Sequence, residues 1–395
     1  MAGVTIKNDV YWVGAIDWNV RNFHGYSTHL GTTYNAYLVL DSKIALIDTV
    51  KAPFYEEMMG RIRQIVDPMD IDVIVSNHVE MDHSGSLPMV MKEAGKATLI
   101  TAERFGESGL KDTFHADWEL TPVKEGDELS LGRRKLVFIP TPMLHWPDSM
   151  ATYLAGDDLL FSMDAFGQHI ASSQRFDDEV GLDVVMPQAA KYYANILMPF
   201  GDLIVKAVDK LGGLKFDTIA TSHGVVWRSH ASEIVDAYRA WGRGDARAKA
   251  LVIYDTMWGS TETMARALVE GIAAEGVEAR LFNLSKTDRS DVIHEVLDAR
   301  ALLVGSPTLN NGLFPTVADF LCYLKGLKPR GKVGAAFGSH GWAGGAVKAI
   351  ESELRAAGVE ILDSDLAIKY VPDEATVERC RAFGGQVASR IKGKE

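Results

Sequence analysis

Two histidines and two carboxylates crowd into one short stretch of this sequence. In SNHVEMDHSGS (76–86), His78, Glu80, Asp82 and His83 share six consecutive positions, although the whole chain has only 11 histidines. The apolar run just before this stretch predicts a strand that delivers the chain to His78. His78 and Glu80 can face the same way if the extended conformation persists, and Asp82 and His83 then point elsewhere. The stretch can therefore present two pairs of metal ligands to two adjacent sites.

Three more candidate ligands follow later apolar runs. They are His145 in FIPTPMLHWPDS, Asp164 in LLFSMDAFG and His223 in TIATSHGVVW. Four imidazoles and three carboxylates make two ligand sets if one carboxylate bridges, and Asp164, isolated between the others in sequence, is the natural bridge. Nitrogen and oxygen donors without a thiolate suit iron, manganese or zinc. The anionic ligand Glu80 and the two other carboxylates favour iron that cycles in redox over hydrolytic zinc, because anionic oxygen stabilises higher oxidation states.

A second candidate site begins in the loop DTMWGSTET (255–263). The loop follows a predicted strand and opens a predicted helix. Its backbone N–H groups, the hydroxyls of Thr256, Ser260 and Thr261, and the helix dipole favour a phosphate. It is not a Walker A loop, because no Gly-Lys-Ser/Thr follows. Since the loop contains no Lys or Arg, neutral donors would hold a monophosphate.

Two further loops, GSPTLNNGLFP (305–315) and GSHGWAGGA (338–346), follow later strands of the same half. In a parallel sheet all three loops lie at the carboxyl edge, where ligands bind. Glycines let the backbone approach a flat ring, Trp342 can stack on it, and Asn310 or Asn311 can hydrogen-bond its edge. The three loops together predict a site for a cofactor with a phosphate and a flat ring. The residues predicted to bind it are Thr256, Met257, Trp258, Gly259, Ser260, Thr261, Pro307, Thr308, Leu309, Asn310, Asn311, Gly312, Ser339, His340, Gly341, Trp342 and Gly344.

The elements around these motifs divide the chain into two halves. The first half is rich in strands at irregular spacing, which suggests an α/β sandwich of two sheets. After the candidate linker AWGRGDARAKA (240–250), five strands and five helices alternate strictly, as in a doubly wound parallel sheet. We expect one domain over residues 1–247 and a second over 248–395.

Composition limits the possible partners. A chain of 395 residues suits two domains. The N-terminus has no basic leader, and no apolar run is long enough to span a bilayer, so we expect neither a signal peptide nor a membrane segment. The net charge of −12 argues against nucleic acid as a partner. Two cysteines, Cys322 and Cys380, lie outside any CxxC motif, which suits a reducing cytoplasm.

The metal-ligand motifs resemble those of a known family. The loop at 78–83 resembles the H-x-H-x-D-H signature of the metallo-β-lactamase fold, with Glu80 in place of the second histidine. Together with PTPMLHWPDSM, SMDAFGQH, YYANIL and TSHGVVWR, it resembles the flavodiiron proteins over essentially the whole chain. The resemblance implies an N-terminal metallo-β-lactamase-like αββα sandwich and a C-terminal flavodoxin-like doubly wound sheet of five parallel strands, which binds FMN.

The resemblance also assigns roles to individual residues. It gives one iron of a non-haem diiron site to His78, Glu80 and His145, the other to Asp82, His83 and His223, and the bridge to Asp164. His24 and Tyr193 resemble residues that approach the diiron pocket, where they could donate a proton or a hydrogen bond to a bound diatomic. His169 is expected to hold a ligand by a hydrogen bond.

The function implied by the resemblance is reduction of O2 to water and/or NO to N2O, with electrons passing through FMN from an external donor. Rubredoxin or a reduced deazaflavin coenzyme would be that donor, and the assembly would be a head-to-tail homodimer or a homotetramer of two such pairs. One alternative is an NO-selective reductase with little O2 activity. Others are a dizinc hydrolase carrying a flavodoxin domain, which Glu80 argues against, and a non-catalytic gas sensor or electron carrier. The sequence does not decide between O2 and NO.

Overall fold

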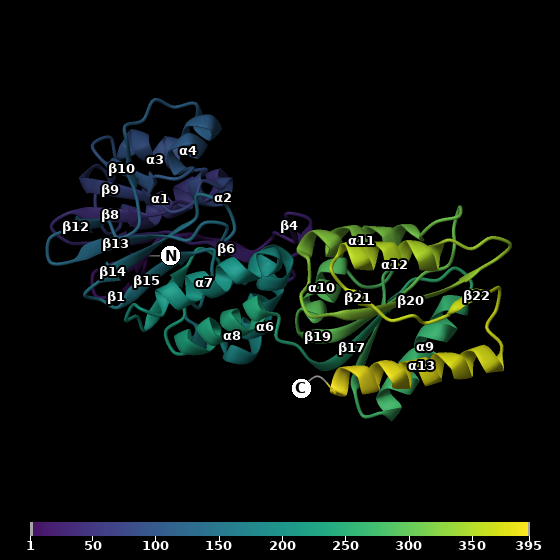
Figure 1. Ribbon diagram of the computed structural model, residues 1–395. Helices are drawn as coiled ribbons and strands as arrows, with labels where there is room; N and C mark the ends of the chain where they lie inside the picture. Colours follow the sequence, from purple (N-terminus) through teal and green to yellow (C-terminus); the bar gives the residue numbers. More distant parts are fainter. Residues whose placement is uncertain (1–2, 394–395) are drawn as a thin grey trace. The chain divides into compact units, whose positions relative to one another are not determined.

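The computed structural model describes residues 3–393 and divides into two compact units (Figure 1). The first unit comprises the chain up to Tyr192 together with Asp202–Arg239, and the second comprises Tyr193–Gly201 and the chain from Ala240 onward. Residues 244–246 separate the last helix of the first half from the first strand of the second. No helix within residues 3–393 is long and apolar enough to cross a membrane.

The first unit is built on two sheets, which confirms the predicted α/β sandwich. The seven-stranded sheet has the order β1-β2-β7-β8-β9-β10-β11, with β1 Val4–Lys7, β2 Val10–Trp12, β7 Tyr37–Val39, β8 Ile44–Ile47, β9 Ile71–Ser76, β10 Thr98–Ala102 and β11 Leu120–Val123. The five-stranded sheet runs in sequence order through β12 Glu128–Ser130, β13 Lys135–Pro140, β14 Met150–Ala155, β15 Leu159–Met163 and β16 Thr218–Thr221.

A single apolar core joins the two sheets. It includes Val75 and Ile100 from the seven-stranded sheet and Phe138, Leu154 and Phe161 from the five-stranded sheet. These strands are rich in β-branched and aromatic residues, which pack well on a pleated surface. In β9, five of the six residues IDVIVS are buried, so this strand lies inside the sandwich and ends at its edge immediately before the first predicted ligand.

Helices and two small antiparallel strand pairs complete the first unit. Its helices are η1 Ala52–Phe54, α1 Tyr55–Ile62, η2 Pro68–Asp70, α2 Met81–Ser84, α3 Leu87–Glu93, α4 Gly106–Phe114, α5 Asp177–Val180, α6 Leu182–Tyr192, α7 Gly201–Leu211 and α8 Ala231–Arg243, of which α8 continues into the second unit from Ala240. Figure 1 shows α1, α3 and α4 beside β8–β10, and α7 and α8 beside β14 and β15. The antiparallel pairs are β3 Ala15–Asp17 with β6 Thr32–Tyr34, and β4 Asn22–Phe23 with β5 Tyr26–Ser27.

The second unit is a parallel sheet of order β18-β17-β19-β20-β21 with helices on both faces, the doubly wound arrangement that the alternating pattern predicts. Its strands are β17 Arg247–Tyr254, β18 Glu278–Asn283, β19 Ala299–Gly305, β20 Val333–His340, β21 Glu360–Ile361 and β22 Ala367–Lys369. The predicted fifth strand is interrupted, because Asp365 adopts a φ of +45°. Both of its halves, β21 and β22, pair with β20 in parallel.

The helices of the second unit are η3 Tyr193–Leu197, η4 Met198–Phe200, α9 Ser260–Ala274, α10 Arg289–Asp298, α11 Pro315–Leu327, α12 Ala346–Ala356 and α13 Glu374–Lys392. Met264 and Leu268 of α9 and Val387 of α13 belong to one core cluster with Val252 and Leu303 of the sheet. The segment η3–η4 belongs to this unit because Asn195 donates to the carbonyl of Ser290 at 3.2 Å and accepts from the hydroxyl of Tyr323 at 3.0 Å.

Candidate metal centre and cofactor pocket

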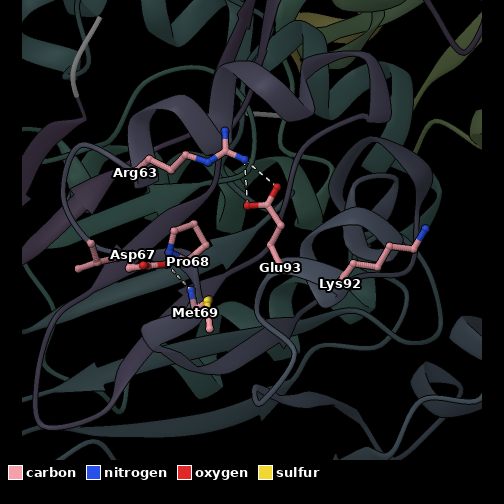
Figure 2. A pocket seen from close by; sticks show the side chains of 7 residues that line it. Arg63, Asp67, Pro68, Met69, Lys92 and Glu93 are labelled. Atoms are coloured by element: carbon pink, nitrogen blue, oxygen red, sulfur yellow. Dashed lines mark hydrogen bonds and ion pairs between the residues drawn. The ribbon is translucent and has the colours of Figure 1, made fainter.

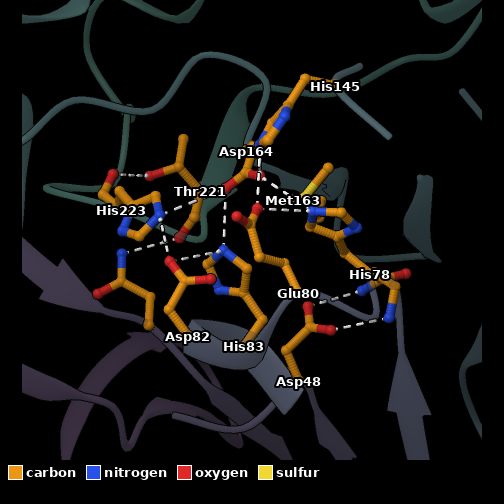
Figure 3. A network of polar contacts seen from close by, with 12 residues as sticks. Asp48, His78, Glu80, Asp82, His83, His145, Met163, Asp164, Thr221 and His223 are labelled. Carbon is orange, nitrogen blue, oxygen red and sulfur yellow. Dashed lines mark hydrogen bonds and ion pairs between the residues drawn. The ribbon is translucent and has the colours of Figure 1, made fainter. Parts of the chain in front are cut away.

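The seven predicted metal ligands meet at the ends of strands in the first unit (Figure 3). β9 delivers His78 and Glu80, and Glu80 occupies the position just before the short helix α2, which carries Asp82 and His83. His145 lies between β13 and β14, Asp164 directly follows β15, and His223 follows β16. Because β15 and β16 are parallel neighbours, their carboxyl ends bring Asp164 and His223 to the same edge.

The ligands form two groups around one carboxylate. His78, Glu80, His145 and Asp164 place their candidate ligand atoms within 4.8 Å of one another, and so do Asp82, His83 and His223. Oδ2 of Asp164 lies 3.7 Å from Nε2 of His78 and 3.2 Å from Nε2 of His145. Its Oδ1 lies 3.0 Å from Nε2 of His83 and 3.5 Å from Nε2 of His223. One oxygen of Asp164 therefore faces each group, as a bridging ligand requires.

The chemistry of this cluster fits metal ions. Both carboxylate oxygens of Asp82 and of Asp164 and both ring nitrogens of His83 are buried and make no hydrogen bond with acceptable geometry in the described chain. Buried carboxylates are costly unless they are hydrogen-bonded, paired or bound to a metal. Four imidazoles and three carboxylates, with no thiolate nearby, form a donor set for two first-row ions such as iron, manganese or zinc.

The electrostatics link metal binding to proton release. Burial by itself lowers the pKa of His78 and His145, but the adjacent carboxylates of Asp148 and Glu80 at His78, and of Asp164 and Glu80 at His145, raise both to about 10. The imidazoles of His83 and His145 likewise outweigh burial and hold the pKa of Asp164 well below its ordinary value. Metal ions must therefore displace protons from the histidines when they bind.

Further side chains orient the ligands. Oδ2 of Asp148 accepts from the backbone N–H of Val79 at 2.7 Å and lies 3.4 Å from Nδ1 of His78, which leaves Nε2 of His78 to face the cluster. Nδ1 of His223 donates to the carbonyl of Thr33 at 2.7 Å. Asp48 accepts from the backbone N–H of Asn77 at 2.8 Å and from its amide group at 2.9 Å (Figure 3).

Asp48 and Asp148 are two further residues near the ligands that were not predicted from the sequence. The available signal for Asp148 was its place in HWPDS, in the same loop as His145. Nothing in the sequence singles out Asp48, which becomes adjacent to the site only because β8 and β9 pair in parallel.

The three candidate neighbours of the site differ in placement. His24 sits in the β4–β5 hairpin with Nε2 2.8 Å from Oε1 of Glu80, so it contacts the cluster directly. His169 does not hydrogen-bond a ligand, contrary to expectation. Its Nδ1 lies 2.6 Å from the hydroxyl of Thr32, which in turn lies 3.5 Å from Nδ1 of His223. Tyr193 belongs to the second unit, where its ring lies 5.1 Å from that of Trp241, and its role at the metal site stays a prediction.

The three predicted cofactor loops line one cavity of about 740 Å³ at the carboxyl edge of the parallel sheet in the second unit. Predicted residues in its wall are Thr256, Met257, Trp258, Ser260, Pro307, Thr308, Leu309, Asn310, Asn311, Ser339, His340, Gly341 and Trp342. Four predicted residues, Gly259, Thr261, Gly312 and Gly344, lie in the same loops but not in this wall. The sequence missed Ala343, Tyr370 and Val371, of which the last two follow β22.

The cavity has the groups that a phosphate-bearing flat ring needs. Gly259 precedes α9 with φ +85°, and no side chain caps this helix, so its first N–H groups can face a phosphate beside Thr256 and Ser260. Trp258 and Trp342 are 93% and 91% exposed, so each offers an indole face on which a ring can stack. A β-carbon at Gly338 in β20 would lie 2.0 Å from the carbonyl oxygen of Ser306, which follows β19. Only glycine therefore lets the ends of these two strands approach this closely.

Another cavity, of about 600 Å³, lies away from both sites. It is lined by Arg63, Val66, Asp67, Pro68, Met69, Lys92 and Glu93 (Figure 2). Arg63 donates to both oxygens of Glu93, at 2.6 and 2.9 Å, so the two charges largely neutralise each other. None of the predicted site residues lines this cavity, and we assign it no role.

Comparisons with known proteins agree with this geometry. Residues 32–224 match the family model described as ODP family beta lactamase, and residues 252–384 match the flavodoxin model. A Moorella thermoacetica protein named nitric oxide reductase is 50% identical over 98% of each chain. The rubredoxin oxygen:oxidoreductase of Desulfovibrio gigas has a TM-score of 0.96 and 39% identity, with 99% of each chain covered. The flavodiiron protein of Giardia intestinalis has a TM-score of 0.97 and 36% identity, with 100% of this chain and 97% of that chain covered.

Proposed function

This chain belongs to the flavodiiron proteins, and from that premise we infer that it is an oxidoreductase that reduces O2 to water, NO to N2O, or both. The observation that carries the inference is the pair of buried ligand groups that share Asp164, in a chain that also has a cavity suited to a flavin. Glu80 supplies an anionic oxygen to the first group, which favours a redox metal over hydrolytic zinc.

We propose that the metal is iron. One ion would be held by His78, Glu80 and His145, a second by Asp82, His83 and His223, and both by Asp164. Bound iron would supply one-electron redox chemistry and open coordination positions for a diatomic, and FMN would supply a store of two electrons. The protein's own contribution is to bury the ligands, to orient His78 through Asp148 and to offset cationic charge with three carboxylates.

His24 is the residue best placed to handle a proton at this site. The Glu80 carboxylate beside Nε2 raises the pKa of His24 above its ordinary value. The side chain remains partly exposed, which lets it exchange protons with solvent. We propose that His24 donates a proton or hydrogen bond to the bound diatomic, and that Tyr193 approaches the same site.

In the second unit, we propose that the cavity binds FMN, with its phosphate at the N-terminus of α9 and its ring among the loops after β17, β19 and β20. The lining residues carry the argument, because they combine hydroxyls, backbone amides and two indoles without a Lys or Arg. The domain boundary after residue 247 remains our prediction.

The external electron donor, the assembly and the compartment are also proposals. The name of the Desulfovibrio gigas relative supports rubredoxin as a donor class, with a reduced deazaflavin as the other candidate. We propose a head-to-tail homodimer, or a homotetramer of two such dimers. The low cysteine usage supports a reducing compartment such as the cytoplasm.

The decisive experiment is anaerobic stopped-flow mixing of the fully reduced, iron- and FMN-loaded protein with O2 and, separately, with NO. Rapid oxidation with water or N2O identified as product is expected. Metal analysis of the purified protein provides the independent check. Zinc in place of about two irons per chain, or no oxidation by either gas, would refute the proposed function.

A further inference from the structure

We propose that Tyr34 is a redox-active tyrosine that protects the metal centre, by giving it one electron and giving a proton to Asp17 when the electron supply is exhausted. This role rests on the proposed O2 reduction, which supplies the oxidant. The ring of Tyr34 is fully buried, and its centroid lies 6.1 Å from that of the ligand His223. The hydroxyl of Tyr34 donates to Oδ2 of Asp17 at 3.1 Å.

A comparison with Tyr192 shows why the proton acceptor matters. The ring of Tyr192 is also buried, and it lies 6.0 Å from the same His223. No carboxylate of the described chain accepts from its hydroxyl. A phenol that loses an electron becomes a strong acid, so its oxidation is far easier when a base can take the proton at the same moment. Distance to His223 therefore does not separate the two tyrosines, whereas the contact with Asp17 favours Tyr34.

Nearby charge acts in the same direction. Nζ of Lys51 lies 5.8 Å from the ring centroid of Tyr34, and this cation opposes a positive charge left on the ring. Electron loss at Tyr34 therefore has to be coupled to proton loss, which yields a neutral radical. Asp17 is held in place for that transfer, because its Oδ1 accepts from the backbone N–H groups of Asn19 and Val20.

Trp12, a second large aromatic side chain linked to the site, is protected against oxidation. The indole N–H of Trp12 donates to Asn35 at 2.7 Å, and Asn35 donates to the carbonyl of Thr221 at 2.8 Å. The guanidinium groups of Arg61 and Arg175 lie 4.8 and 4.4 Å from the Trp12 ring. Two cations against one indole disfavour a cation radical on it, so Tyr34 accommodates an oxidising equivalent better than Trp12 does.

The proposed step is balanced. The O–H bond of Tyr34 breaks, one electron reduces the oxidised metal centre, and the proton forms an O–H bond on Asp17. The products are a neutral tyrosyl radical and a neutral carboxylic acid. One electron from the external donor, with return of the same proton, restores the phenol and the carboxylate.

The test uses iron- and FMN-loaded protein that is reduced with a limiting amount of donor, mixed with O2 and frozen for electron paramagnetic resonance. We expect a tyrosyl radical in the wild type, its loss in Tyr34→Phe and a strong decrease in Asp17→Asn. The matched control Tyr192→Phe should retain it. Growth on ring-deuterated tyrosine should narrow the signal of a tyrosyl radical and leave that of a flavin semiquinone unchanged.

A second readout is the damage that the radical prevents. Under limiting donor, Tyr34→Phe should inactivate after several-fold fewer turnovers than the wild type, with oxidised ligand histidines detected by peptide mass spectrometry. The inference is overturned if wild-type protein consumes O2 without forming a tyrosyl radical, or if the radical survives Tyr34→Phe or is lost in Tyr192→Phe. If the loaded wild type does not consume O2 at all, O2 reduction fails as well, and this outcome is distinct from the others.

Discussion

Replacing Asp148 by asparagine should weaken iron binding at one of the two sites and spare the other. Asp148 is 4% exposed and contacts only the first ligand group, through Nδ1 of His78. The amide oxygen of asparagine can still accept from the backbone N–H of Val79. The substitution therefore removes the negative charge that orients and polarises His78, with little change in shape.

The expected loss of iron affinity follows from the contacts that Asp148 makes. Removing the partner of a metal-bound histidine typically lowers metal affinity about 10- to 100-fold, or about 1.4–2.7 kcal/mol. Asp148→Ala should in addition lower the free energy of unfolding by about 1–3 kcal/mol, because it leaves the buried N–H of Val79 without an acceptor.

The assay is anaerobic titration of metal-free protein with Fe²⁺ in competition with a chromophoric chelator. Wild type should show two tight sites, and Asp148→Asn one tight and one weakened site. The matched control is Asp177→Asn, another fully buried carboxylate of the same unit, which accepts from the backbone N–H groups of Arg228 and His230. Two unchanged sites in Asp148→Asn, or an equal loss in Asp177→Asn, would refute the reasoning.

Three further predictions test other parts of the molecule. The Asp164→Ala variant should lack iron at both sites and show no turnover. The His145→Ala variant should also show no turnover, with iron lost mainly from one site. Both variants should keep FMN; metal analysis measures the iron and flavin absorbance measures the FMN. Trp342→Ala should weaken FMN binding by about 0.5–1.5 kcal/mol, roughly two- to tenfold in Kd by flavin fluorescence, with iron content unchanged. Burial lowers the pKa of Lys332 to about 7, so the unfolded state binds more protons than the folded state from about pH 7 to its ordinary value. The stability of the second unit should therefore rise across this window, and Lys332→Met should flatten the dependence of its melting temperature on pH; a wild-type melting temperature that does not rise with pH would contradict this.

The sequence predicted the fold because both halves follow simple rules. Strict alternation of buried strands and amphipathic helices after residue 247 leaves a doubly wound sheet as the natural arrangement, and β17 to β20 follow it. The same rule does not reveal the break at Asp365, because a positive φ in a polar residue leaves no pattern in hydropathy. Nor does it assign η3 and η4 to the second unit, since hydrogen bonds from Asn195 to distant residues decide that.

The candidate ligands were predictable for a different reason. Each ends or follows a buried strand, and a polar residue at that position is conspicuous against the apolar run before it. Asp48 also follows a strand, β8, but a single aspartate at a strand end is ordinary and carries no signal. Its importance comes from the register between β8 and β9, which places it beside Asn77 in the loop that carries His78.

The position of Asp164 predicts that the two ligand groups act as one centre. Each of its oxygens faces one group at hydrogen-bonding or ion-pair distance from two imidazoles, and neither oxygen has a hydrogen-bond donor of its own. In the metal-free protein, protons on the surrounding histidines offset its charge. Burial lowers the pKa of His83 and His145, but Asp82 and Asp164 at His83, and Asp164 and Glu80 at His145, raise both. If metal ions took over that role, the same carboxylate would offset both of them, so the charge of one ion would affect the binding of the other. Burial strengthens this coupling, because charges in a poorly solvated site interact over longer distances than they do in water.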